Sequence, residues 1–449
     1  MIISEFPAKA AGAASLLALA MAVGLASPAR ALDVAAVKPA IVAEVNADYP
    51  HLDALYKDIH THPELGFQET RTAAKLAAEM RALGFTVTEG VGKTGVVAIY
   101  HNGPGPLVLV RTELDALPMQ EKTGLPYASV AKAMWRGRET WVAHSCGHDS
   151  HMAIWVGTAK ALLTLKSQWS GTLMFIGQPS EETVGGAKAM LADGLYTRFG
   201  KPDYAFALHV SPAPAGEIAY KIGVLTSTAD TLEITFHGRG AHGSMPDRSL
   251  DPVVMAARFI EDVQTVISRE KDPAAFGVVT VGSVEAGTAG NIIPDHADLK
   301  GTIRTYDDGV RQKILEGVRR TAAGVAAISG APAPDVTIGD TAFAVVNDAD
   351  LTNRTAVVLK EAFPGHVTEE TKPGAPSEDF SEFVRAGVPG TFLSLGALDP
   401  ALIAAYKAKG EPVPVNHSPL FAPVPEPTIK AGVEAMTLTV MNVMPPKGA

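Results

Sequence analysis

The chain has 449 residues and a formal net charge of −10, with 47% hydrophobic and 19% charged residues. A chain of this length is too long to fold around one ordinary hydrophobic core, so we expect two or three domains. The composition is typical of a soluble globular protein. The acidic balance argues against a nucleic-acid partner, which would leave a basic footprint. Aromatic residues make up only 6%, whereas 42 glycines and 32 prolines favour an α/β protein with many turns.

Residues 1–31 have the pattern of a signal peptide. Lys9 precedes the apolar run AGAASLLALAMAVGLA, which is short for a membrane-spanning helix. Ala29 and Ala31 form a small-x-small pattern that predicts cleavage before Leu32. The alternative is an uncleaved membrane anchor. Cleavage would give an exported protein, periplasmic or secreted, without stable membrane association, whose single cysteine excludes an internal disulfide.

Helical and strand patterns alternate after the leader. The alternation predicts a mostly parallel sheet covered by helices. In such sheets functional groups gather beyond the carboxyl ends of the strands, where Glu181, Glu182 and His209 fall. We expect helices at about 37–60, 70–83, 152–165, 185–191 and 426–443, and strands at about 95–100, 107–112, 171–178 and 204–210.

The pattern changes near residue 223. TLEITFHGRG alternates like a half-exposed strand, and helices follow at about 252–270 and 308–328 with two strands between them. Strand–helix–strand–strand–helix–strand is a compact module with one covered sheet face. We therefore predict a small α+β domain at 223–337, inserted into a main domain formed by 32–222 and 338–449.

The stretch HSCGHDSH, residues 144–151, holds the only cysteine of the chain. A lone buried cysteine is most often a small core residue, and one Cys-x-His pair is a weak signal. Here Gly147 separates Cys146 from His148 and allows both side chains to turn toward one point. A thiolate is a good ligand for a borderline-soft divalent metal and can bridge two metals.

Further ligands are expected at other strand ends. Glu181 and Glu182 follow an apolar strand and precede GGA. They either lie in a solvated turn, or one of them binds a metal while the other acts as the general base. His209 ends an apolar strand and is either a core histidine or a ligand. His417 lies in the proline-bounded loop NHSPLF, where it is either a plain loop residue or a ligand.

Nine markers in order resemble the metallo-amidohydrolases and carboxypeptidases related to aminoacylase, in particular the subgroup with hippurate hydrolases and indole-acetyl-amino-acid hydrolases. The resemblance covers nearly all of the chain after the leader. The markers are HTHPELGFQET (60–70), RTELDALPMQEKTGLPYAS (111–129), HSCGHDSHMA (144–153), GQPSEETVGGAKAML (177–191), LHV (208–210), GRGAHGSMPDRSLDPV (238–253), NIIPDHADLKGTIRT (291–305), PSEDFSEF (376–383) and NHSPLF (416–421).

The resemblance implies a dinuclear-metal exopeptidase type of fold, with the insert as a lid or dimerisation domain. It implies two divalent metal ions, Zn, Mn or Co, with Cys146 as the bridging ligand. Glu181 matches the general base, and Asp115 matches an aspartate that orients a ligand histidine. The implied ligands are Cys146, His148, Glu182, His209 and His417.

The resemblance also assigns residues of the insert. His242 matches a histidine that reaches the scissile carbonyl, often across a dimer interface, so the chain is a candidate homodimer. Asn291 and Arg304 match positions at the carboxylate end of the substrate, although Arg304 fits a surface arginine on a strand equally well.

The resemblance implies hydrolysis of the amide bond of N-acyl amino acids or short peptides with a free carboxylate. The alternatives are a dipeptidase or a carbamoyl-amide hydrolase of the same fold, and a periplasmic binding protein without turnover. Glu181 beside Glu182 argues against a pure binder, which would not need the extra base. The acyl group, the amino acid and the native metal stay open.

Several residues depart from the family pattern or stay outside it. Glu113 stands where the family usually has aspartate, and we assign it no role. Ser145 and Ser150 replace the usual alanine and glycine. The segment 130–142 is either an outer hairpin, which we favour, or a substrate entrance. We expect supporting rather than ligand roles for a further group, which comprises His60, His62, His151 and Asp149.

Overall fold

The structure is a computed structural model that describes residues 32–448. The part of the chain that begins at Leu32 forms one compact unit. The predicted signal peptide, residues 1–31, lies outside the described residues and stays a prediction. Among the described helices, none combines the length and the apolar character needed to cross a membrane.

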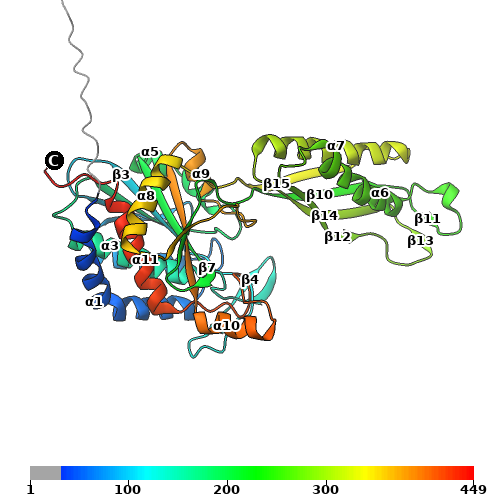
Figure 1. Ribbon diagram of the computed structural model, residues 1–449. Helices are drawn as coiled ribbons and strands as arrows, with labels where there is room; N and C mark the ends of the chain where they lie inside the picture. The colour runs from blue at the N-terminus through cyan, green and yellow to red at the C-terminus, as the bar shows by residue number, and fades with distance from the viewer. Residues whose placement is uncertain (1–31, 449) are drawn as a thin grey trace, which may run out of the picture. The chain divides into compact units, whose positions relative to one another are not determined.

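An eight-stranded mixed sheet, mostly parallel, forms the centre of the main domain (Figure 1). β3 pairs in parallel with β6 and β7, and β7 pairs in parallel with β18. Helices cover both faces, which confirms the predicted fold class. The strands, in spatial order, are β1 (Thr86–Val91), β2 (Gly95–His101), β6 (Thr172–Gln178), β3 (Leu107–Glu113), β7 (Tyr204–Pro214), β18 (Gly390–Leu398), β8 (Ile218–Tyr220) and β17 (Val367–Glu369).

Alternate residues of the central strands face two different helical layers. On β3, Val108 and Val110 belong to one core, whereas Leu109 belongs to the other. Burial on both faces explains why these strands are nearly continuous apolar runs. The first layer contains α1 (Val34–Thr61), α2 (Thr70–Ala82), α3 (His148–Thr164), α8 (Ala349–Ala362), α10 (Pro400–Lys409) and α11 (Pro425–Met441); the second contains α4 (Gly186–Ala192), α5 (Leu195–Phe199) and α9 (Ser381–Arg385).

Two glycines set the close packing of α3 against α11. A Cβ on Gly157 of α3 would lie 2.6 Å from Val433, and a Cβ on Gly432 of α11 would lie 2.4 Å from Ile154. Glycine is unfavourable inside a helix, so both positions indicate close helix contact. This contact holds α3, whose first residue is His148, against the sheet.

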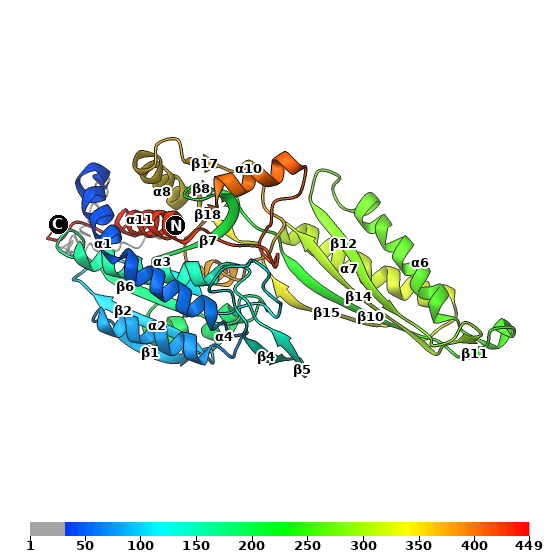
Figure 2. The same cartoon turned by 90° about the horizontal axis from the view of Figure 1, so that it is seen from below.

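The inserted sheet is covered by two helices (Figure 2), and its buried side chains form a separate core. On β10, Leu232, Ile234 and Phe236 are buried while Glu233 is exposed, as expected for a sheet with one covered face. All its strand pairs are antiparallel, in the order β12-β14-β10-β15. The elements in chain order are β10 (Ala229–His237), α6 (Pro252–Thr265) continued by the π-helical turn η2 (Val266–Glu270), β12 (Gly277–Glu285), β14 (His296–Thr305), α7 (Asp308–Ile328) and β15 (Asp335–Ala342).

Three short strand pairs complete the fold. The segments that enter and leave the insert pair as β9 (Gly223–Val224) with β16 (Val346–Asn347). β15 continues past residue 337, and the predicted domain boundaries at 223 and 337 stay predictions. The segment 130–142 forms the predicted hairpin. The remaining short elements are β4 (Lys132–Trp135) with β5 (Arg138–Trp141), β11 (Ala241–His242) with β13 (Ile292–Ile293), and the 3-10 turn η1 (Pro246–Arg248).

Phe259 on α6 is fully buried in the separate core of the insert. We therefore expect that shortening this side chain destabilises the insert locally. Phe259→Ala should lower the free energy of unfolding of the insert by about 3–5 kcal/mol. The control is Val254→Ala on the exposed side of the same helix, which should change it by less than ~0.5 kcal/mol. Amide hydrogen exchange measures the change in each variant. Equal protection of the insert in the two variants would contradict the inference that the insert depends on this core.

Candidate active site

Three neighbouring parallel strands bring the candidate residues to one edge of the sheet. Asp115 follows β3, and Glu181 and Glu182 follow β6 in the turn before α4. His209 comes from β7, which continues to Pro214, so His209 lies within the strand and not at its end as predicted. His148 is the first residue of α3.

Gly147 makes the turn between Cys146 and His148. Its φ of 91° lies in the left-handed region, which favours glycine. A Cβ at this position would also lie 2.4 Å from Cγ2 of Val210 on β7. Glycine therefore allows both ligand candidates to approach the β7 strand, which carries His209.

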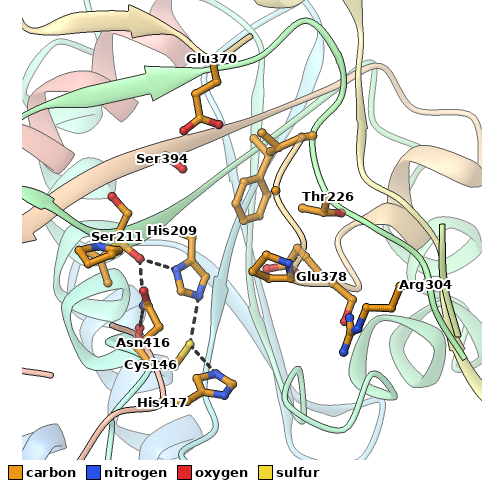
Figure 3. Close-up of a pocket in the computed structure, with 17 residues that line it drawn as sticks. Cys146, His209, Ser211, Thr226, Arg304, Glu370, Glu378, Ser394, Asn416 and His417 are labelled. Carbon is orange, nitrogen blue, oxygen red and sulfur yellow. Dashed lines mark hydrogen bonds between the residues drawn. The ribbon is translucent and has the colours of Figure 1, made fainter. Parts of the chain in front are cut away.

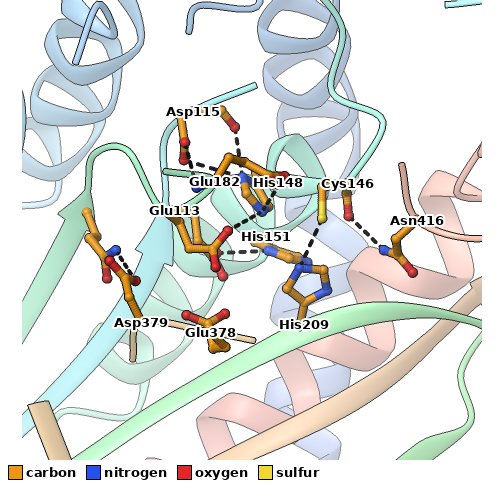
Figure 4. A network of polar contacts seen from close by, with 12 residues as sticks. Glu113, Asp115, Cys146, His148, His151, Glu182, His209, Glu378, Asp379 and Asn416 are labelled. Carbon is orange, nitrogen blue, oxygen red and sulfur yellow. Dashed lines mark hydrogen bonds and ion pairs between the residues drawn. The ribbon is translucent and has the colours of Figure 1, made fainter. Parts of the chain in front are cut away.

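Four of the predicted metal ligands converge in Figure 4, namely Cys146, His148, Glu182 and His209. Sγ of Cys146 lies 3.3 Å from Nε2 of His209 and 3.2 Å from Nε2 of His417. Oε2 of Glu182 lies 3.3 Å from Nε2 of His417, and its Oε1 lies 4.0 Å from Nε2 of His148. Cys146, Glu182 and His417 thus form one candidate metal-binding group, and His148, Glu181 and Glu182 form a second that shares Glu182.

The hydrogen bonds of two histidines leave Nε2 available for a metal. Nδ1 of His148 donates to the backbone oxygen of Asp115 at 2.8 Å, and Nδ1 of His209 donates to that of Val210 at 2.8 Å. Nε2 of His148 is buried without a hydrogen-bond partner in the described residues. Such bonds fix the tautomer of metal-binding histidines. The Asp115 carboxylate also lies near His148, with Oδ1 3.6 Å from Nδ1, and its Oδ2 accepts from the Glu182 backbone N–H at 3.0 Å.

A loop far along the chain completes the cluster. His417 has a φ of 67°, which is uncommon for a residue other than glycine. Its backbone N–H donates a hydrogen bond of 2.8 Å to the backbone oxygen of Ser145. Nδ2 of Asn416 donates to the backbone oxygens of Cys146 and Val210 at 3.0 and 3.1 Å. Asn416, which the sequence did not single out, therefore fixes the loop against β7 and against the turn that carries Cys146.

The charges of the cluster favour a bound cation. Burial, with the negative charges of Glu182 and Glu181, raises the pKa of the Cys146 thiol well above its usual value. Burial lowers the pKa of His148, but its bond to Asp115 and the charges of Glu113 and Glu182 raise it to about 10. Metal ions would compensate this excess of negative charge and stabilise the thiolate. The donors present, sulfur, imidazole and carboxylate, fit such ions.

A second buried network lies beside this cluster and escaped the sequence analysis. Arg111 on β3 is fully buried and pairs with Glu113, Glu378 and Asp379. Its Nη2 lies 2.7 Å from Oε1 of Glu378 and 3.3 Å from Oδ1 of Asp379. Glu378 and Asp379 belong to the PSEDFSEF marker, whose role the sequence left open, and both lie close to Glu181.

Glu113 has a structural partner that its sequence context did not reveal. Its Oε2 accepts a hydrogen bond of 2.9 Å from Nδ1 of His151, and Nε2 of His151 accepts from the Val210 N–H at 2.8 Å. Both ring nitrogens of His151 are therefore occupied, although His151 also lies close to Glu113, His148 and His209. The geometry favours the expected supporting role for His151.

A cavity of about 500 Å³ opens beside the cluster (Figure 3). Cys146, His209 and His417 lie on one side of it, and Arg304 of β14 lines it too. Nη1 of Arg304 is buried without a hydrogen-bond partner in the described residues. His242 and Asn291 are not among the lining residues; they lie together beside β11 and β13, where Gly243 N donates to Asn291 O at 2.8 Å.

The other histidines and serines have different surroundings. His60 is buried, with Nδ1 2.5 Å from the Asp149 carboxylate and Nε2 3.1 Å from that of Glu121, so Asp149 supports His60. His62 is exposed. Burial lowers the pKa of His144 to about 3, and neither of its ring nitrogens has a partner in the described residues. Nothing in the structure explains the hydroxyls of Ser145 and Ser150.

Comparisons with known proteins agree with this geometry. A model of peptidase family M20/M25/M40 matches residues 109–432. Thermostable carboxypeptidase 1 of Saccharolobus solfataricus is 35% identical over 391 residues, 86% of this chain and 93% of the relative. Hippurate hydrolase of Campylobacter jejuni is 36% identical over 330 residues, 72% of this chain and 82% of the relative.

A solved structure supports the same assignment. The YXEP protein of Bacillus subtilis, described as a dinuclear metal binding peptidase of the M20 family, is similar with a TM-score of 0.71 and 28% identity, over 89% of this chain and 99% of that chain. The chain therefore belongs to peptidase family M20/M25/M40 and is a metal-dependent amidohydrolase.

Proposed function

We propose that the protein hydrolyses the amide bond of N-acyl amino acids or short peptides with a free carboxylate, with Glu181 as the general base. One observation carries the proposal. The Glu181 carboxylate is buried, makes no hydrogen bond to the described residues, and lies 3.9 Å from Nε2 of His148. A carboxylate in this position is free to exchange a proton with a water molecule held beside the metal ligands.

The proposed metal site has five ligands, with Cys146 as the proposed bridge; its Sγ contacts His209 and His417, while Glu182 is shared by the two candidate groups. When bound, two divalent ions would lower the pKa of a water molecule and polarise the amide carbonyl. The mixture of sulfur, nitrogen and oxygen donors suits Zn, while Mn or Co occupy similar sites. The proposed ligands are Cys146, His148, Glu182, His209 and His417.

The electrostatic surroundings of Glu181 favour uptake of a proton. Burial, followed by the charges of Glu378, Glu182 and Asp379, raises its pKa well above the usual glutamate value. A carboxylate with a raised pKa is a stronger base. Glu181 would take a proton from the attacking water and pass it to the nitrogen of the leaving amine.

Arg304 is the proposed contact for the substrate carboxylate. Its unpartnered Nη1 at the cavity supports this, because guanidinium groups bind carboxylates through paired hydrogen bonds. For His242 and Asn291, contact with a substrate in the cavity depends on a second subunit. Their roles and the homodimer stay predictions.

The names of the relatives, carboxypeptidase and hippurate hydrolase, support amide cleavage without deciding between peptides and acylated amino acids. Hydrolysis assays with hippurate and N-acetyl amino acids, compared with dipeptides and carbamoylated amino acids, separate the proposed function from the alternatives. Binding of these compounds without turnover in the presence of Zn, Mn or Co would instead favour a binding protein.

Glu181→Gln should retain the bound metal and lose turnover, because the amide cannot accept the proton of the attacking water. We expect kcat to fall by about 10²–10⁴-fold. Steady-state kinetics and elemental analysis of the same preparation measure the two effects. The matched control is Glu233→Gln, which removes an exposed carboxylate on β10 and should leave kcat unchanged. Full activity of Glu181→Gln would exclude Glu181 as the base.

Cys146→Ser should lose metal and activity together, because a serine hydroxyl does not ionise as a thiol does and cannot supply an anionic bridge. Elemental analysis after dialysis and a hydrolysis assay measure this. If Cys146 only fills the core, the variant would keep its metal and activity and lose roughly 1 kcal/mol of stability. Thermal unfolding of the metal-free wild type and variant isolates that packing effect.

A further inference from the structure

The cavity contains a second charged group, distant from the metal cluster. Glu370 follows β17 and lines the same cavity as Cys146 and His417. Figure 3 shows its carboxylate turned toward Ser394, on the side of the cavity away from Cys146 and His417. A substrate bound at the metal cluster that extends across this cavity would reach Glu370.

The Glu370 carboxylate has no ion pair or hydrogen bond within residues 32–448. The backbone N–H of Glu370 donates a hydrogen bond of 2.7 Å to the backbone oxygen of Tyr220, which fixes Glu370 beside β8. Lys221 lies near enough to act on Glu370 electrostatically, but its Nζ donates to the Ile222 oxygen at 3.4 Å. Burial raises the pKa of Glu370, because a half-buried carboxylate without a paired cation is less stable in its charged form.

The walls around Glu370 suit an alkyl chain that ends in a donor. Phe392, Leu225 and Pro376 contribute apolar surface to the lining of the cavity. Ser394 adds a hydroxyl near Glu370, and its oxygen can accept a hydrogen bond. An ammonium group has three N–H donors and no acceptor, so a carboxylate and a hydroxyl match it.

The other charges of the cavity strengthen this reading of Glu370. Glu378 also lines the cavity, but it already pairs with Arg111. Arg304, in contrast, has a free donor for a substrate carboxylate. The cavity therefore offers one available positive group and one available negative group, and it is complementary to a molecule that carries both a carboxylate and a cation.

We propose that Glu370 is a specificity-determining residue that selects substrates with a terminal alkyl-ammonium group. The inference rests on the proposed amidohydrolase function and names its substrate class. The ammonium group could belong either to the amino acid that leaves or to the acyl group, and both sources share the chemistry that Glu370 recognises.

The experiment compares four substrates with the metal-loaded enzyme. Nα-acetyl-lysine and its neutral isostere Nα-acetyl-2-aminoheptanoate place the ammonium on the amino acid, whereas 6-aminohexanoyl-alanine and heptanoyl-alanine place it on the acyl group. In one of the two pairs the wild type should show about tenfold higher kcat/KM for the charged member, the size of one charged hydrogen bond. The pair that shows the preference identifies the source.

Glu370→Gln should abolish this preference by lowering kcat/KM for the charged substrate and leaving that for its neutral isostere unchanged. Glu370→Lys should reverse the preference. The control is Glu369→Gln, which makes the same charge change at the neighbouring exposed residue and should behave as the wild type. Equal preferences in wild type and Glu370→Gln would overturn the proposal.

Failure of the proposed function gives a different result. If the wild type hydrolyses none of the four compounds, the hydrolytic function fails, and calorimetric binding of the same compounds then decides the role of Glu370. Tighter binding of a charged member that disappears in Glu370→Gln supports the proposal. Equal binding of charged and neutral members overturns it.

Discussion

The ion pairs of Arg111 are the interaction on which the rest of the site depends. Its guanidinium is fully buried at the end of β3 and pairs with Glu113, Glu378 and Asp379. Carboxylates that are this deeply buried repel one another and resist loss of water, so a fixed cation is needed to hold them together. Loss of one partner of such a pair typically costs about 3–5 kcal/mol. Arg111 thereby joins β3 to the segment that carries Glu378 and Asp379, and through Glu113 it also positions His151.

The site divides into two charge systems. Around Arg111 the negative charges have a protein cation, whereas Cys146, Glu181 and Glu182 meet mainly histidines among the described residues. In the first system the charges are paired with one another within the described residues. In the second, several metal-ligating atoms lie close to one another. This division explains why a carboxylate-rich site can be both stable and ready for metal ions.

Much of this arrangement follows from local sequence, and the rest depends on distant contacts. Helix and strand periodicity predicts the layered fold, and the polar residues after each apolar strand predict that Glu182 and His209 gather at one edge. Glu113 received no role because its partner His151 lies on the next helix, and the contact exists only after β3 and α3 pack. Glu370 was missed because it follows a strand of three residues, with no periodic pattern, at the far edge of the sheet.

The position of His417 has a consequence for the order of assembly. The other proposed ligands lie between Cys146 and His209, but this one comes from a loop after β18, close to the end of the chain. β18 pairs in parallel with β7, and the loop that follows it brings His417 to the thiol. During synthesis the ligand set is therefore incomplete until residue 417 has emerged, and bound metal ions would fasten this late segment to the segments that carry the earlier ligands.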